Sequence, residues 1–141
     1  NRCTEPDPVR QVEDGLEDLM GSAAKAQELL KRTIAGNDWT QGVVCSHPCG
    51  VPIALFAHDP GLKTLESARA KAVVRYGPTE GSMCYRHITD LSRLLLVFKT
   101  CEMLMAGLDQ IVRRFEVVDV RNFFANPGRL GVRYVEVLVV V

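Results

Sequence analysis

The spacing of apolar residues changes along this chain, and that change limits the folds it can adopt. In the first half, apolar residues recur every three or four positions, which is the period of an α-helix with one buried face. In the second half, continuous or alternating apolar runs that are typical of β-strands occur before and after one further helical stretch. Because 141 residues suffice for one buried core, the sequence predicts an α+β fold, close to the α/β class, in which helices pack against a mixed β-sheet.

The helical pattern predicts three helices. The first extends over about residues 9–36, with acidic side chains near its start and basic ones near its end, as the helix dipole favours. Asp59 is suited to cap the second helix, which should end at Gly77-Pro78, and Thr100 is suited to cap the third. The apolar face of the first helix comprises Val9, Val12, Leu16, Leu19, Met20, Ala23, Ala26, Leu30 and Ile34.

Three strands are expected after the second helix. Residues 88–98 end in a continuous apolar run typical of a central strand that is buried on both faces. Residues 115–120 and 132–141 are separated by the turn signal Asn126-Pro127-Gly128, so we expect them to be antiparallel neighbours. The predicted order is therefore helix, helix, strand, helix, strand, strand.

The chain is expected to have two parts. Residues 1–58 comprise the first helix and an irregular connection, and residues 59–141 comprise the α/β core. The last apolar run, Val137–Val141, continues to the final residue without a turn or cap. We therefore expect that the natural protein continues beyond this strand or that another protein subunit covers it.

The charge balance limits the class of partner. Lys and Arg number 17 and Asp and Glu number 17, so the formal net charge is zero. Residues 1–57 hold 5 basic and 8 acidic side chains, whereas residues 58–141 hold 12 and 9. A long nucleic acid is not an expected partner, but nucleotide phosphates are compatible with the small basic excess of the second part. No apolar run approaches the ~20 residues of a membrane span.

The five cysteines are scattered and do not resemble the disulfide framework of a secreted protein. A reducing intracellular compartment is therefore expected. Residue 1 is Asn rather than Met, which leaves processing after import into an organelle open. The one cluster is Cys45, His47 and Cys49, whose side chains are potential zinc ligands. A turn with free thiols and a local disulfide between the two cysteines are the alternatives.

Three segments of the second part together resemble a known family. They are residues 61–63 with 71–77, residues 87–98, and residues 115–127 with 131–134. In order and spacing they resemble the nucleotidyltransferase-like synthetase domain of the RelA/SpoT family, whose members make guanosine tetra- and pentaphosphate. The resemblance covers about residues 60–141 and is to the divergent branch of that family.

The resemblance implies a site for pyrophosphoryl transfer. Such chemistry needs a carboxylate that holds Mg²⁺ across the phosphates and cations that offset the developing charge. Asp90 is the candidate for the catalytic carboxylate and Mg²⁺ ligand, although an Asp at this place could equally cap the start of a strand. The candidates for phosphate binding are Lys63, Lys71, Arg75 and Arg93.

Several positions depart from the family pattern. Ser67 and Phe123 stand where basic residues are expected, and Val132 replaces the aromatic residue that stacks on the nucleotide. Tyr134 occupies an acidic position, and the family's second catalytic carboxylate, in a Glu-x-Gln segment, has no counterpart. The expected function is therefore that of a degenerate, non-catalytic structural or accessory subunit of a larger assembly. The alternatives are a Mg²⁺-dependent pyrophosphokinase that uses ATP and GDP or GTP, and a nucleotide-binding sensor.

Overall fold

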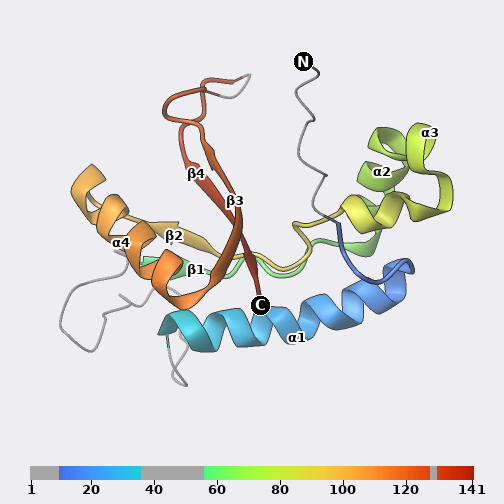
Figure 1. Cartoon of the computed structure of the whole chain (residues 1–141), viewed down its shortest axis with the longest axis horizontal. Coiled ribbons are helices and arrows are strands. Elements are labelled where there is room, and N and C mark those ends of the chain that lie inside the picture. The colour runs from blue at the N-terminus through green and yellow to red at the C-terminus, as the bar shows by residue number, and fades with distance from the viewer. Residues whose placement is uncertain (1–9, 36–55, 128–129) are drawn as a thin grey trace, which may run out of the picture. The chain divides into compact units, whose positions relative to one another are not determined.

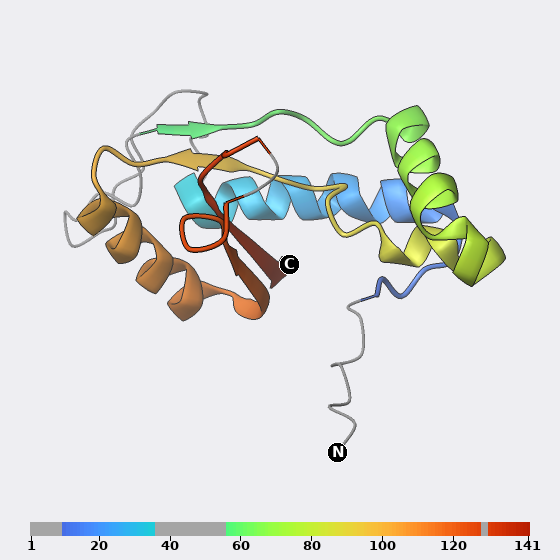
Figure 2. The same ribbon diagram turned by 90° about the horizontal axis from the view of Figure 1, so that it is seen from above.

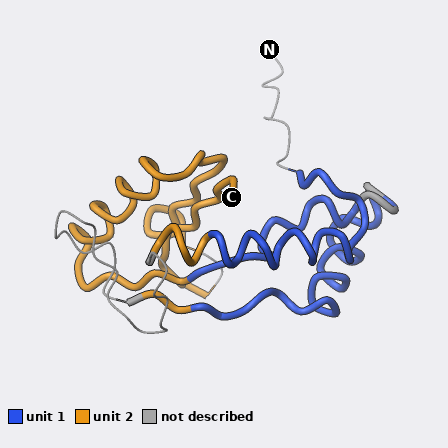
Figure 3. Tube along the Cα trace, turned by 90° about the horizontal axis from the view of Figure 1, so that it is seen from below, with its two compact units in different colours: residues 1–29, 59–94 blue, residues 30–58, 95–141 orange. Residues whose placement is uncertain are grey.

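The computed structural model of the chain describes residues 10–35, 56–127 and 130–141 (Figure 1). The chain forms two compact units, each built from two stretches of sequence (Figure 3). Unit 1 comprises residues 1–29 and 59–94, and unit 2 comprises residues 30–58 and 95–141. Helix α1, Leu16–Ala35, contributes residues to both units.

Unit 1 has a helical core. Helix α2, Leu65–Arg75, begins at Thr64, whose hydroxyl accepts a hydrogen bond from the Ser67 amide. The short helix α3, Gly77–Glu80, has a proline in its first turn and leads into the 3-10 helix η1, Gly81–His87. The buried core of this unit comprises Leu16, Leu19, Ala23, Ala68, Ala72, Cys84, Ile88 and Leu91.

A buried glutamine joins α1 to the rest of unit 1. Gln27 is only 5% exposed, yet all four of its hydrogen-bonding positions are used. Its Nε2 donates to Asp59 Oδ1 at 2.7 Å and to Arg93 O at 2.8 Å. Its Oε1 accepts from Ser92 Oγ at 2.9 Å and from the Arg93 amide at 2.8 Å. The Gln27 side chain therefore fixes the two segments that flank the core of this unit.

Unit 2, within its described residues, holds two separate two-stranded antiparallel sheets and one full helix (Figure 2). Strand β1, Phe56–His58, pairs with β2, Leu95–Val97. Helix α4, Cys101–Arg114, begins at Thr100, whose hydroxyl accepts from the Met103 amide, as predicted. At its other end, Arg114 Nη1 donates to the Thr33 carbonyl at 3.0 Å and thereby ties α4 to the last turns of α1.

The second sheet is a hairpin of β3, Glu116–Asn122, and β4, Val135–Val140. A bulge interrupts the pairing between Val117 and Asp119, which pair with consecutive β4 residues. Because of this extra residue, Val117 and Val120 lie on the same face, opposite Val139 and Val137. The hairpin is therefore amphipathic, with valines on one face and the Asp119, Arg121 and Glu136 ion pairs on the other.

The α+β class is confirmed, and so is the antiparallel pairing of the last two predicted strands. The expected single mixed sheet is wrong for the part of the chain that the structure describes, because both sheets are antiparallel and two-stranded. The strand predicted over residues 88–98 forms only at Leu95–Val97, and Leu95 is 53% exposed rather than buried. The preceding residues are irregular because their backbone groups bond to Lys63 and Gln27 instead of a neighbouring strand.

The starts of the first two helices also differ from the prediction. Helix α1 begins at Leu16 rather than near residue 9, because the Gln11 amide donates to the Arg86 carbonyl and not to a helical neighbour. Helix α2 is capped by Thr64, since the Asp59 carboxylate bonds elsewhere. Among the described helices, none combines the length and the apolarity needed to cross a membrane.

We predict that Gln27→Leu lowers the free energy of unfolding by at least about 2 kcal/mol. Leu has a similar volume, but it removes the hydrogen bonds that the buried Gln27 side chain makes with the Arg93 backbone and with Asp59 Oδ1. Urea denaturation followed by circular dichroism measures this loss. Lys25→Ala, at an exposed position of the same helix, is the control and should change stability by less than about 0.5 kcal/mol.

Candidate functional site

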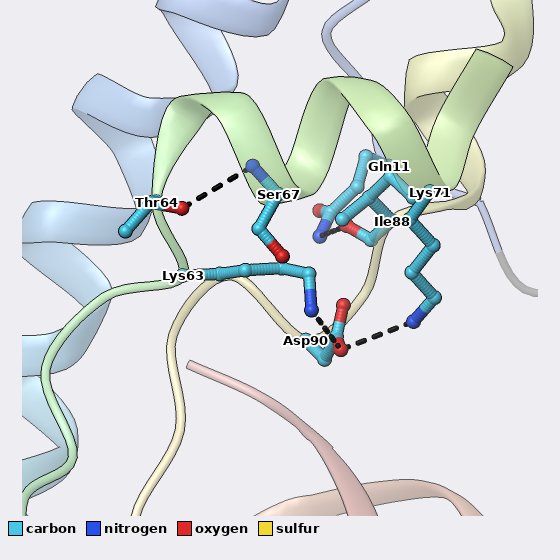
Figure 4. Close-up of polar contacts among 7 residues, drawn as sticks. All are labelled: Gln11, Lys63, Thr64, Ser67, Lys71, Ile88 and Asp90. Carbon is cyan, nitrogen blue, oxygen red and sulfur yellow. Dashed lines mark hydrogen bonds and ion pairs between the residues drawn. The ribbon is translucent and has the colours of Figure 1, made fainter.

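Three of the predicted site residues meet in unit 1 (Figure 4). Lys63 Nζ lies 3.2 Å from Asp90 Oδ2, and Lys71 Nζ lies 3.0 Å from the same oxygen. Lys63 directly precedes the Thr64 cap of α2, and Lys71 lies two turns into that helix. Asp90 belongs to the irregular segment after η1. The cluster therefore joins a helix start, a helix face and a loop, and we call it the Asp90 cluster.

Buried neighbours hold the Asp90 cluster in place. Ile88 and Leu91, on either side of Asp90 in the sequence, are almost fully buried. The Lys63 amide donates to the Leu91 carbonyl at 3.0 Å, so the backbones beside the ion pair are also bonded. Gln11 Nε2 donates to the Ile88 carbonyl at 3.2 Å and so also holds this loop (Figure 4). These contacts position Asp90 through its neighbours.

The two lysines determine the charge state of Asp90. Partial burial raises the pKa of the Asp90 carboxyl, but hydrogen bonds and charge attraction from Lys71 and Lys63 outweigh burial, and the net pKa is lowered. The carboxylate is therefore ionised at neutral pH, and the cluster carries a net charge of one positive unit. Its other oxygen, Oδ1, is buried and accepts no hydrogen bond from the described residues.

This arrangement does not fit Mg²⁺. A magnesium ion needs oxygen ligands in octahedral geometry and keeps several waters, whereas Asp90 Oδ2 already accepts from two ammonium groups and Oδ1 is shielded from solvent. A divalent cation here would also be repelled by Lys63 and Lys71. No group of three or more His, Cys, Asp or Glu side chains placed to hold a metal occurs among the described residues.

The two predicted arginines do not join the Asp90 cluster. The Arg75 guanidinium lies over the Tyr76 ring, 5.7 Å from its centroid, and Tyr76 in turn stacks on His87 at 4.7 Å. Arg93 is held through its backbone by Gln27, and its side chain is exposed. Neither arginine forms an ion pair with Asp90 in the described part of the chain. Two of the four predicted phosphate ligands therefore contact the candidate carboxylate.

Other predicted positions lie outside the Asp90 cluster. The potential zinc ligands Cys45, His47 and Cys49 lie outside the residues that the structure describes. Val132, predicted to replace a nucleotide-stacking aromatic residue, is 52% exposed in the segment before β4. In the same hairpin, Phe123 stacks on Tyr134 with ring centroids 4.6 Å apart. The aromatic rings of the hairpin therefore contact each other.

Two residues that position the Asp90 cluster were not predicted from the sequence. Gln27 holds Arg93, three residues beyond Asp90, and Arg86 holds the segment before α1 through the Gln11 carbonyl at 2.7 Å. A signal for Gln27 exists, because it follows the buried Ala23 by four residues and so places a polar side chain on the apolar face of a helix. Arg86 carries no such signal.

We predict that Asp90→Asn destabilises the chain by about 1–3 kcal/mol at neutral pH, because two ammonium groups lose their shared carboxylate. The pKa of Asp90 is lower in the folded chain than its ordinary value of 3.8. Its contribution is therefore complete above that value and is lost as the pH falls through the folded pKa. The difference between wild type and variant, measured by urea denaturation from pH 7 to 2.5, should shrink only below about pH 4.

The control is Glu136→Gln, which removes an exposed carboxylate 3.7 Å from Arg121 and should cost less than about 1 kcal/mol. A loss in Asp90→Asn that stays constant down to pH 2.5 would contradict an ionic origin of the stabilisation.

Comparisons with known proteins identify no family for this chain. No family model, no curated protein and no solved structure matches the chain. The resemblance to the RelA/SpoT synthetase domain, and the nucleotidyltransferase-like topology that it implies, therefore remain predictions from the sequence. The function must be proposed from the chain's own residues.

Proposed function

We propose that this chain is a divergent RelA/SpoT-like domain that acts as a non-catalytic structural or accessory subunit in a protein assembly. The observation that carries the proposal is the closure of Asp90 by Lys63 and Lys71. The residues that the family resemblance assigns to Mg²⁺ and to phosphate bind one another here, at 3.2 and 3.0 Å.

The closed cluster favours a structural role for physical reasons. Pyrophosphoryl transfer requires a carboxylate open to the metal and cations open to the phosphates. Releasing Asp90 would leave a half-buried carboxylate and the largely buried Lys63 ammonium without a partner. A buried charge without a partner lowers the stability of the fold. The pair also joins the start of α2 to the loop that contains the buried Ile88 and Leu91. The closed cluster thus stabilises the core of unit 1.

The hairpin of β3 and β4 supports a role in an assembly. Four valines of the hairpin region are between 41% and 53% exposed. Val120 lies on the apolar face, Val118 at the bulge, Val140 on the opposite face, and Val141 directly after β4. Within the described residues, neither strand pairs with a third strand, so each has an edge with free backbone groups. Exposed apolar strands with an open edge are suited to receive a strand of a partner protein. We therefore propose the hairpin as the contact with other subunits.

The alternative of a nucleotide sensor has one supporting observation. Lys71 retains about a third of its side-chain exposure, and the net positive charge of the cluster attracts phosphate. A sensor would bind a purine nucleotide without turnover, whereas a Mg²⁺-dependent pyrophosphokinase would convert it.

The protein incubated with ATP, GDP or GTP, and Mg²⁺ should yield no pyrophosphorylated nucleotide, and its Tm should not rise with nucleotide. Chromatography of the products and differential scanning fluorimetry measure the two outcomes. A guanosine tetra- or pentaphosphate product would overturn the proposal in favour of the enzyme. A rise in Tm without turnover would favour the sensor.

The contact surface is tested by Val120→Lys in cells that make the protein naturally. We expect this variant to leave the high-mass fraction in native size-exclusion chromatography, because a lysine at the half-exposed Val120 charges the apolar face of the hairpin. Val74→Lys, at an exposed position of α2, is the matched control and should stay in that fraction. Equal behaviour of the two variants would contradict the proposed surface.

A further inference from the structure

Helix α4 carries a row of three apolar side chains, Met105, Leu108 and Val112, of which two are exposed to solvent. Met105 is 65% exposed and Val112 is 59% exposed, although both are large and apolar. They are seven residues apart, so they project within about 20° of each other around the helix, with Leu108 beside them. Exposed apolar residues scattered singly need no explanation, but an aligned row on one helix face indicates a contact surface.

A row of charged side chains runs beside the apolar row. Glu102, Asp109 and Arg113 are all exposed, and they occupy neighbouring directions around the helix. The acidic Glu102 lies in the first turn of α4 and the basic Arg113 in the last, while Asp109 pairs with Arg113 at 2.8 Å. The charge of this row therefore changes sign from one end of the helix to the other.

Such a face is complementary to itself when two helices pack antiparallel. A two-fold axis at Leu108 places Met105 of one helix opposite Val112 of the other, and Glu102 opposite Arg113. Along the sequence, the midpoint of residues 105 and 112 and the midpoint of residues 102 and 113 both lie within one residue of Leu108. One axis therefore satisfies both pairs. Each contact then occurs twice, as expected for an isologous interface. The apolar row supplies burial, and the charges select the antiparallel orientation.

We infer that the chain self-associates through α4, with a second copy of α4 packed antiparallel as the occupant of this face. This surface is distinct from the hairpin, and the inference does not rest on the proposed function. The helix has 14 residues and is about 21 Å long. A pair of such helices buries less than the ~1,200 Å² of a typical stable interface, so the dimer is expected to be weak and dependent on concentration.

Sedimentation equilibrium of the whole chain under reducing conditions tests the inference. The wild type should show a reversible monomer–dimer equilibrium that weakens as salt is added. Met105→Lys should weaken the dimer at least about tenfold, because it places two charges in the apolar row. Val74→Lys, the control on α2, should leave the equilibrium unchanged.

A charge exchange makes the test independent of folding defects. The first variant, Glu102→Arg, makes both ends of the row basic. The second variant carries Asp109→Arg and Arg113→Glu. It keeps the ion pair within the helix with the two charges exchanged, and it makes both ends of the charged row acidic. Each variant alone should be largely monomeric, and an equimolar mixture should form a heterodimer, because every facing pair is then of opposite charge.

A wild type that stays monomeric at millimolar concentration would overturn the inference. So would a dimer that all the α4 variants leave unchanged, since a different surface would then hold it. A mixture that associates no more tightly than its components would overturn the antiparallel geometry.

Discussion

The carboxylate of Asp90, shared by two ammonium groups, is the interaction on which unit 1 depends. One oxygen accepts from Lys63 and Lys71, so a residue before α2 and a residue within it are tied to the same loop atom. The loop is buried on both sides of this point, at Ile88 and Leu91. Charge pairing and apolar burial thus act on the same few residues, which explains why an ionised carboxylate is tolerated beside the core.

The Asp90 cluster resembles a phosphate-handling site in its sequence but not in its contacts. Lys63, Lys71 and Asp90 stand in the order and spacing that resemble a phosphate-handling domain, and the structure brings these three together. The same proximity occupies the carboxylate, because both ammonium groups donate to one of its oxygens. Exposed apolar side chains lie on the hairpin and on α4, among other places in the described part of the chain. Both suit contacts with protein, which fits the proposed role better than contacts with a charged nucleotide.

The sequence predicted the parts of the fold that depend on local patterns. Thr100 capped the third helix as expected, and the alternating valines before the end of the chain formed an antiparallel hairpin with the preceding strand. Partners distant in sequence were not accessible to this reasoning. Residues 88–98 resemble a strand because they end in a continuous apolar run, but the backbone groups of residues 91 and 93 bond to Lys63 and Gln27. For the same reason the pairing of Asp90 with two lysines, 19 and 27 residues away, could not be read from spacing.

The central claim is that Asp90 is an ion-pair centre and not a metal ligand. Paramagnetic broadening by Mn²⁺, a substitute for Mg²⁺, tests this claim most directly through the carbon signal of the Asp90 carboxyl group. With Mn²⁺ and ATP added below one equivalent, we expect that signal to broaden no more than those of the exposed carboxylates of Glu136 and Asp109. Selective broadening of the Asp90 signal would contradict the claim, since it would place the metal on the carboxylate that the two lysines hold.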